Sequence, residues 1–484
     1  MSVRQGAKEG IMSGMTWSYA ERLISQAVTL LVSIILARLL VPEDYGIIAM
    51  VSVFITIGDA LVNGGFGNAL VHKKDATELD FNSICLLGFG VSAVIYFVLF
   101  ISAPLISAWY ETPVLVPVVR VMGLKFIFSA WNSVQYAYIQ KKMIFSRLFW
   151  SSFIATVVSA IVGIIMAFSG FGVWALITQN LSFSIVSSFV MFFTIGWKPK
   201  LQFSFQSVKE LWSFGAKVLG ATLVFTLRDN LRTLIIGKRF SADDLAYYNE
   251  GLKFPSLLVV DIVNSMGKVI YPVFVDKRED MNQFKLLMRR AISLSAYILT
   301  PMMVGLFMVS ESFVSVVLTD KWLPCVPYLR IMCIVYVTRS ISTIYQKALF
   351  SIGKSNLNLI HEVLTSTITV ILLFVAVFAF DSVLLIAWSA VAVMVLGLGF
   401  YAIMVRRLFG YSFVEMIYDY LPATALSVLM AVFVYLTGAL IENNVLKLIM
   451  QIIIGVAVYI ILSIATKNKE FKYVKNKVMH ILKR

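Results

Sequence analysis

Long apolar segments separated by short polar ones run through the whole sequence. Each lasts roughly 20–28 residues, enough for a helix to cross about 30 Å of hydrocarbon, whereas the strands of a membrane barrel would be shorter and would alternate in polarity. The pattern predicts an all-α polytopic membrane protein with about fourteen transmembrane helices. The predicted spans lie near residues 14–40, 45–70, 81–109, 114–139, 146–169, 171–196, 210–237, 243–275, 288–317, 324–350, 356–380, 382–405, 417–440 and 444–466.

Two motifs occur twice in the chain. The segment 17–22 (WSYAER) recurs at 212–217 (WSFGAK), and 116–122 (VPVVRVM) recurs at 326–332 (VPYLRIM), each copy roughly 200 residues after the first. This spacing indicates an internal duplication of six spans. An even number of spans keeps both copies in the same orientation, as in parallel repeats. We expect two six-helix lobes, residues 1–200 and 201–410, followed by two additional helices and a basic tail in residues 411–484.

The charged residues follow the predicted loops. The chain has 484 residues, of which 60% are hydrophobic and 14% charged, with a formal net charge of +15. Most Lys and Arg residues fall in alternate short loops and in the C-terminal tail, which places both termini in the cytoplasm and requires an even number of spans. This placement favours a membrane surface over nucleic acid as the reason for the positive charge.

The predicted loops contain few residues of the kinds that bind metals or catalyse reactions. The three cysteines and three histidines have no metal-like spacing, so we expect no metal and no cofactor. The predicted external loops are short and offer no catalytic segment with paired carboxylates. We therefore expect a transporter, not an enzyme. A membrane-embedded glycan polymerase or glycosyltransferase stays open as an alternative of a different class.

Ionisable residues inside spans should face protein or water, because exposing them to lipid is unfavourable. They recur at helical spacing on spans 1, 2, 7 and 8, the first two spans of each predicted repeat. The bases exceed the acids, which suits an anion such as a pyrophosphate. The predicted substrate-binding residues of this cationic cavity are Arg22, Lys217, Arg228, Arg232, Lys253 and Lys268. The carboxylates that could couple transport to a proton or sodium ion are Asp59, Asp229 and Asp261.

Structural roles compete with these interpretations. Oppositely charged pairs can pin helices together, and Lys or Arg near a span end can reach the headgroups. For Lys125 either role is open. A polar row on span 4 could contact sugar, although packing in the core or at the membrane interface is the stronger interpretation; it consists of Trp131, Asn132, Gln135 and Tyr136.

Five segments resemble one family of bacterial membrane proteins: 36–46 (LARLLVPEDYG), 64–71 (GGFGNALV), 247–256 (YYNEGLKFPS), 271–274 (YPVF) and 320–324 (DKWLP). They are similar to polysaccharide transporters, the Wzx-like flippases for lipopolysaccharide, capsule and colanic-acid precursors, of the multidrug/oligosaccharidyl-lipid/polysaccharide exporter superfamily. The resemblance covers the chain to about residue 407.

The resemblance implies a V-shaped transporter of two lobes that works by alternating access in the bacterial inner membrane. Its implied substrate is an undecaprenyl-pyrophosphate-linked oligosaccharide repeat unit, flipped for lipopolysaccharide, exopolysaccharide or capsule biosynthesis. Implied partners are membrane lipids, the polysaccharide polymerase and the chain-length machinery. An ion-coupled multidrug exporter of the same superfamily is the alternative, although a cationic cavity suits it less well.

Overall fold

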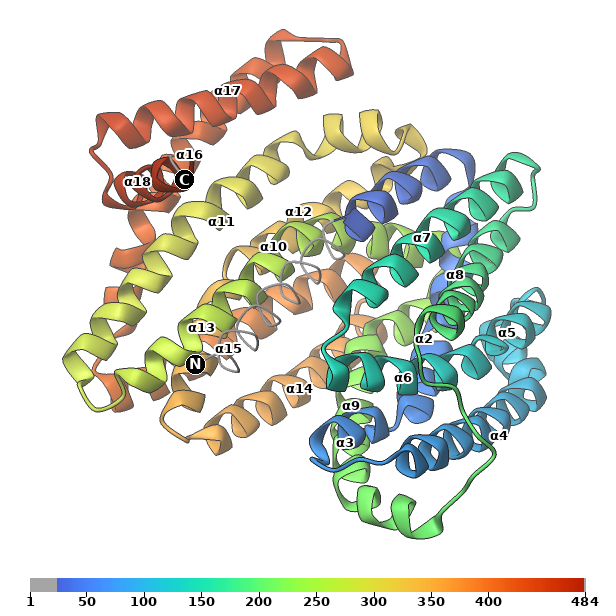
Figure 1. The fold of residues 1–484 in the computed structure, drawn as a ribbon. Helices are drawn as coiled ribbons and strands as arrows, with labels where there is room; N and C mark the ends of the chain where they lie inside the picture. Colours follow the sequence, from blue (N-terminus) through green and yellow to red (C-terminus); the bar gives the residue numbers. More distant parts are fainter. Residues whose placement is uncertain (1–23, 483–484) are drawn as a thin grey trace. The chain divides into compact units, whose positions relative to one another are not determined.

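Helices form nearly the whole of the part that the structure describes. The structure, a computed structural model, describes residues 24–482, and no strand occurs among them (Figure 1). The chain divides into two compact units, Met1–Leu245 and Ala246–Arg484. The first unit contains Ile24–Leu39, α2 (Pro42–Asn63), α3 (Phe66–His72), α4 (Glu78–Tyr110), α5 (Leu115–Gly123), α6 (Lys125–Lys142), α7 (Phe145–Phe168), α8 (Val173–Thr194) and α9 (Phe205–Arg239).

The second unit contains all but the first turn of α10, which begins just before the boundary. Its elements are α10 (Ala242–Asp276), α11 (Met281–Val317), the 3-10 helix η1 (Asp320–Cys325), α12 (Val326–Val337), α13 (Arg339–Ser351), α14 (Ser355–Phe378), α15 (Val383–Phe409), α16 (Phe413–Leu440), α17 (Asn444–Ala465) and α18 (Lys469–Leu482).

Between residues 24 and 482, eleven helical segments are long and apolar enough to cross a membrane. The prediction of an all-helical, multi-pass membrane protein is thus confirmed. Three further predicted spans also contain helices, but these helices are too short or too polar to be counted among the eleven. The first is described only from Ile24 to Leu39, and α9 is too polar. Span 10 is divided into two short helices, α12 and α13, at Thr338. The total of fourteen and the duplicated lobes stay predictions.

Large apolar side chains cover the outside of these helices. Phe97, Phe168 and Leu440 are 64–85% exposed, and only 17% of the most apolar window of α4 is buried. Apolar exposure on this scale would be unfavourable in water, but it is what hydrocarbon requires of a helix surface.

The core of the first unit is an aromatic cluster between α4, α6, α8 and the segment after α8. Trp131 stacks on Trp197 with ring centroids 6.2 Å apart, and Phe81 packs against Trp197 at 5.8 Å. Small residues bring α7 and α8 close together: the Ser151 hydroxyl donates to the Ser187 carbonyl at 3.1 Å. This packing fixes α6 and α8, which carry much of the site described below.

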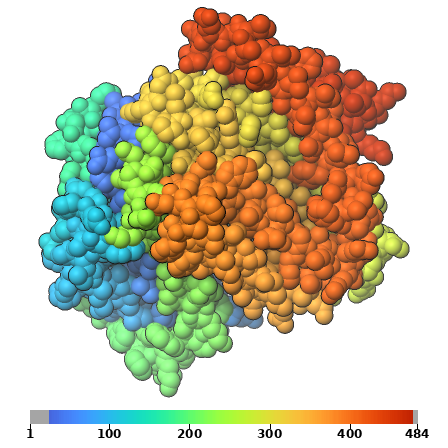
Figure 2. All heavy atoms as spheres, turned by 180° about the vertical axis from the view of Figure 1, so that it is seen from behind, coloured from blue at the N-terminus to red at the C-terminus, as the bar shows by residue number. Residues whose placement is uncertain are grey.

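In the second unit, Phe284 stacks between Phe274 and Phe409 at 4.7 and 4.6 Å, joining α10, α11 and α15. The last helices attach to α11 through polar contacts: Tyr297 donates to the Ser463 hydroxyl of α17 at 2.9 Å. In the space-filling view the orange to red atoms of the C-terminal helices form a continuous surface of this unit (Figure 2).

Candidate functional site: a polar cavity in the first unit

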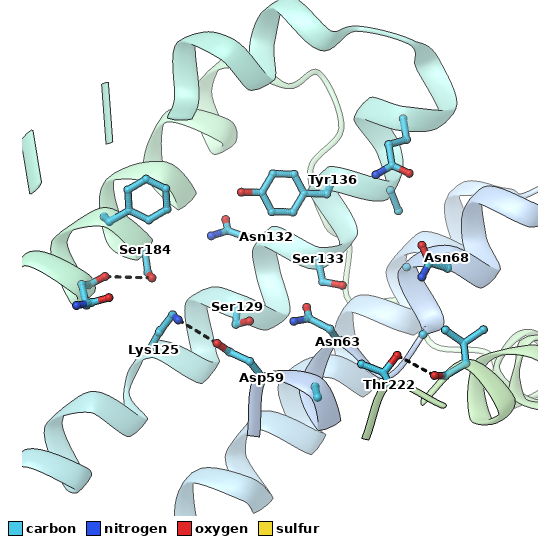
Figure 3. Close-up of a pocket in the computed structure, with 18 residues that line it drawn as sticks. Asp59, Asn63, Asn68, Lys125, Ser129, Asn132, Ser133, Tyr136, Ser184 and Thr222 are labelled. Carbon is cyan, nitrogen blue, oxygen red and sulfur yellow. Dashed lines mark hydrogen bonds and ion pairs between the residues drawn. The ribbon is translucent and has the colours of Figure 1, made fainter. Parts of the chain in front are cut away.

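A cavity of about 640 Å³ lies inside the first unit, among α2, α3, α6, α8 and α9 (Figure 3). Its lining is mostly amide and hydroxyl groups, although of the surrounding helices α2, α3, α6 and α8 belong to segments apolar enough to span a membrane. The polar lining residues are Asp59, Asn63, Asn68, Lys125, Ser129, Asn132, Ser133, Tyr136, Gln140, Asn180, Ser184 and Thr222.

Two glycines shape one wall of the cavity. Gly64 and Gly65 adopt positive φ angles of 49° and 71°, a conformation that glycine reaches without strain, and they separate α2 from α3. A Cβ on Gly65 would lie 2.7 Å from both the Gly215 carbonyl oxygen and the Val218 Cβ of α9. The break therefore lets α9 approach closely and sets Asn63 and Asn68, on either side of it, along the cavity.

A second break places the one ion pair among the described lining residues. α5 ends at Gly123, α6 begins at Lys125, and the Lys125 ammonium lies 2.9 Å from the Asp59 carboxylate of α2. Both side chains are largely buried, with 28% and 20% exposed. The other carboxylate oxygen of Asp59 is buried and has no hydrogen-bond partner among the described residues. The pair is therefore electrically neutral.

One face of α6 continues the polar lining. Ser129, Asn132, Ser133 and Tyr136 follow at steps of three, one and three, so they share a helix face and border the cavity together (Figure 3). The Ser188 hydroxyl donates to the Asn132 side-chain oxygen at 2.9 Å and fixes that amide.

Of the polar row predicted on span 4, Asn132 and Tyr136 thus line the cavity. Trp131 lies in the aromatic core, as the stronger interpretation held. Gln135 is fully buried, and neither atom of its amide has a hydrogen-bond partner in the described part of the chain.

The predicted cations of the first unit that the structure describes lie on α9, and they are not among the lining residues of this cavity. Lys217 is exposed, and Arg228 pairs with Asp229 at 3.3 Å while its guanidinium lies 5.0 Å from the Phe225 ring centre. Arg232 is half-buried, and its Nε has no hydrogen-bond partner among residues 24–482. Arg22 lies outside the described residues.

The remaining predicted residues belong to α10 in the second unit. Lys253 pairs with Glu250 at 2.7 Å, and Glu250 itself is buried. Lys268 is exposed and Asp261 is half-buried. The substrate-binding role of the six cations and the coupling role of the three carboxylates stay predictions.

Lys125 was not among the predicted site residues, and its role was left open between a structural and a functional one. Asp59 was among the predicted residues of span 2, and it lines the cavity together with Asn63. The signal for Lys125 was available: an ammonium in a span needs a partner, and the carboxylate of Asp59 lies in the neighbouring predicted hairpin. Sequence alone does not pair two residues that are 66 positions apart.

Comparison with known proteins adds family relationships to this geometry. The family described as "Polysaccharide biosynthesis protein" matches residues 35–327. The lipopolysaccharide biosynthesis protein WzxC of Escherichia coli (strain K12) is 24% identical over 347 residues, covering 69% of this chain and 68% of WzxC. The teichuronic acid biosynthesis protein TuaB of Bacillus subtilis (strain 168) is 24% identical over 353 residues, covering 72% of each chain.

A solved structure shows the same fold. The chain matches the lipid II flippase MurJ, in an inward closed conformation, with a TM-score of 0.74 over 94% of this chain and 99% of that one. The identity is 16%, so the likeness concerns the path of the backbone and transfers no site residue.

Proposed function

Because the chain belongs to the polysaccharide biosynthesis protein family, within the multidrug/oligosaccharidyl-lipid/polysaccharide exporter superfamily, we propose that it flips undecaprenyl-pyrophosphate-linked oligosaccharide repeat units across the bacterial inner membrane. The names of WzxC and TuaB refer to the synthesis of surface polymers, and MurJ is named for flipping a lipid-linked precursor. These names support the substrate class.

The observation that carries the proposal is the polar cavity. A membrane protein places amides and hydroxyls in an apolar environment only where they are paired or face water or a ligand, because unpaired polar groups are unfavourable there. A glycan is rich in hydroxyl groups and needs such a surface on its way through the membrane. The volume of about 640 Å³ falls within the range of roughly 300–1,000 Å³ that small-molecule sites occupy.

The cations of α9 are proposed to meet the pyrophosphate. Arg228 and Arg232 lie on the same helix as the cavity residue Thr222, and ten residues of helix span about 15 Å. A headgroup could therefore place its sugars in the cavity and its phosphates near the guanidiniums, which bind phosphate oxygens in a forked geometry. Arg22, Lys217, Lys253 and Lys268 would extend this cationic region.

The transport cycle proposed here is alternating access by two six-helix lobes in a fourteen-helix protein with both termini in the cytoplasm. Spans 4 and 10 are each broken once, at Leu124 and at Thr338, and each resumes with a basic residue. Broken helices at matching places of two repeats are typical of transporter binding sites, which supports the duplication. Proton or sodium coupling through Asp59, Asp229 or Asp261 remains part of the proposal.

Complementation tests this function. The wild-type chain is expressed in a bacterium that lacks its own polysaccharide flippase, alongside Arg22→Ala, Arg228→Ala and Arg232→Ala. We expect wild type to restore surface polymer and the three variants to lose most of it at equal membrane expression. Lys238→Ala is the matched control on α9, because Lys238 forms an exposed pair with Glu111, outside the predicted stripe, and it should restore polymer fully.

Failure of wild type across hosts with different glycans would overturn the proposal. Increased drug resistance in those same cells would favour the multidrug exporter. Incorporation of labelled sugar into polymer by the purified protein alone would favour the glycosyltransferase.

A further inference from the structure

The charge of the cavity differs from that of the cationic helix segment beside it. Among the described residues that line it, Asp59 and Lys125 are the only carboxylate and the only ammonium, and they neutralise each other at 2.9 Å. The other polar lining groups are amides, hydroxyls and one phenol, all uncharged at neutral pH. We propose that this cavity is a binding site for the uncharged sugars of the headgroup and that the Asp59–Lys125 pair excludes sugars that carry a carboxylate.

This inference rests on the proposed function and specifies the class of glycan. Side-chain amides donate and accept hydrogen bonds, so those of Asn63, Asn132 and Asn180 suit sugar hydroxyls and acetamido groups, which also do both. Phe183 and Tyr136 add ring faces against which the apolar face of a pyranose can pack.

A uronic acid, which carries a carboxylate, would be bound unfavourably in this cavity. Its carboxylate would be repelled by Asp59, and it could obtain a cationic partner in the cavity only by drawing Lys125 away from Asp59. That exchange leaves one carboxylate unpaired in a largely buried place, which is strongly unfavourable. The pair therefore discriminates by charge, a repulsive element that acts against the wrong ligand.

The labelling rate of a cysteine introduced beside the pair depends on the electrostatic potential of the cavity and on whether a ligand occupies it. Ser129 lies one helical turn after Lys125 and borders the cavity (Figure 3), while the native Cys85, Cys325 and Cys333 are buried. Full-length Ser129→Cys protein in lipid nanodiscs is labelled with an anionic and a cationic methanethiosulfonate, and the ratio of the two rates is measured. Unsubstituted protein gives the background from native thiols.

Charge variants in the Ser129→Cys background test the pair. We expect Asp59→Asn to raise the ratio of anionic to cationic labelling and Lys125→Met to lower it, each roughly tenfold, as one uncompensated charge at close range would do. The double variant should return the ratio to its starting value. If the ratio does not respond to either single change, the pair does not set the potential of the cavity and the inference fails.

Sugar protection tests the ligand class. A neutral hexose trisaccharide should slow labelling of Ser129→Cys, whereas the matched trisaccharide with one uronic acid should not; in the Asp59→Asn background the acidic trisaccharide should also protect. Protection by neither sugar, or by both equally in the Ser129→Cys protein, would overturn the inference. If neutral sugar protects the Ser129→Cys thiol while wild type fails to restore polymer in any host, the inferred sugar site is supported and the proposed flippase function is contradicted.

Discussion

The two units use charged residues in different ways. In the second unit, Arg289 donates to both carboxylate oxygens of Asp419 at 2.8 and 2.7 Å, and the Tyr411 hydroxyl donates to the same carboxylate at 2.8 Å. In the first unit, Asp59 has a single described partner, Lys125, and faces a cavity of about 640 Å³. The Asp419 carboxylate accepts three hydrogen bonds from protein groups, whereas Asp59 has one cationic partner and borders a cavity.

The difference separates a structural cluster from a site. The Arg289–Asp419 contact joins α11 to α16, as do Lys285 and Glu415 at 2.8 Å. Charges that saturate one another hold helices together. Charges and amides that surround a hollow contribute less to stability and remain available to a substrate. Substitutions in the two regions should therefore affect different measurements.

The largest expected effect is on stability, in the second unit. Arg289→Met should lower the free energy of unfolding by about 3 kcal/mol, because it leaves the mostly buried Asp419 carboxylate, 11% exposed, without its cation. Thermal unfolding of the detergent-solubilised protein measures this. Arg289→Met combined with Asp419→Leu should recover much of the loss, since no charge is then left unpaired; no recovery would show that the cluster does more than balance charge.

The next effect concerns the backbone of the cavity wall. Gly65→Ala should lower the free energy of unfolding by about 2 kcal/mol, because the residue has φ 71° and its Cβ would meet the α9 backbone. Gly220→Ala on α9 is the matched control. A Cβ there has no neighbour within 4 Å, so this change should be neutral or stabilising by up to about 1 kcal/mol. Equal unfolding temperatures for the two variants would contradict the role given to the α2–α3 break.

The cavity pair should respond in the opposite way to the Arg289 cluster. Asp59→Asn should lower the free energy of unfolding by about 1 kcal/mol, less than Arg289→Met does, because the unpaired Lys125 ammonium is 28% exposed and borders a cavity. Polymer export in the complementation host should nevertheless fall severalfold for a neutral glycan, since a free ammonium replaces a neutral pair. A variant that unfolds like Arg289→Met would place Asp59 among the structural pairs.

The smallest effect is expected at an exposed pair of the second unit. Glu311 lies 2.9 Å from Arg330 beside a cavity of about 400 Å³ but is 64% exposed. Glu311→Gln should change stability by less than about 0.5 kcal/mol, because water solvates both partners. Export should not change, as measured by surface polymer. A clear export defect would mean that the second unit also contributes a polar site.

Much of the fold could be predicted from the sequence, because apolar length and loop charge are local signals. The described parts of the predicted spans coincide with helices, and Asp59, a predicted ionisable residue of span 2, lines a cavity together with Asn63 one helical turn later. These features depend on neighbours in the chain.

The cavity could not be predicted in the same way, because its neutrality depends on pairing between distant segments. The bases of spans 1, 7 and 8 predict a cationic cavity, which stays a prediction, and the cavity in the first unit instead pairs Asp59 with Lys125 of the fourth predicted span. For the polar row of span 4, packing in the core or at the membrane interface was the stronger interpretation, yet Trp131 lies in the core and Asn132 lines the cavity. Only tertiary packing separates the two.

Reconstitution tests the central claim most directly. Purified full-length protein is placed in vesicles that carry a polyprenyl-pyrophosphate-linked oligosaccharide of neutral sugars in both leaflets, and a membrane-impermeant glycosidase is added outside. The account predicts that cleavage proceeds beyond the outer-leaflet share in vesicles with wild-type protein and stops at that share in protein-free vesicles. Cleavage that stops at the outer-leaflet share with well-folded wild-type protein would contradict it.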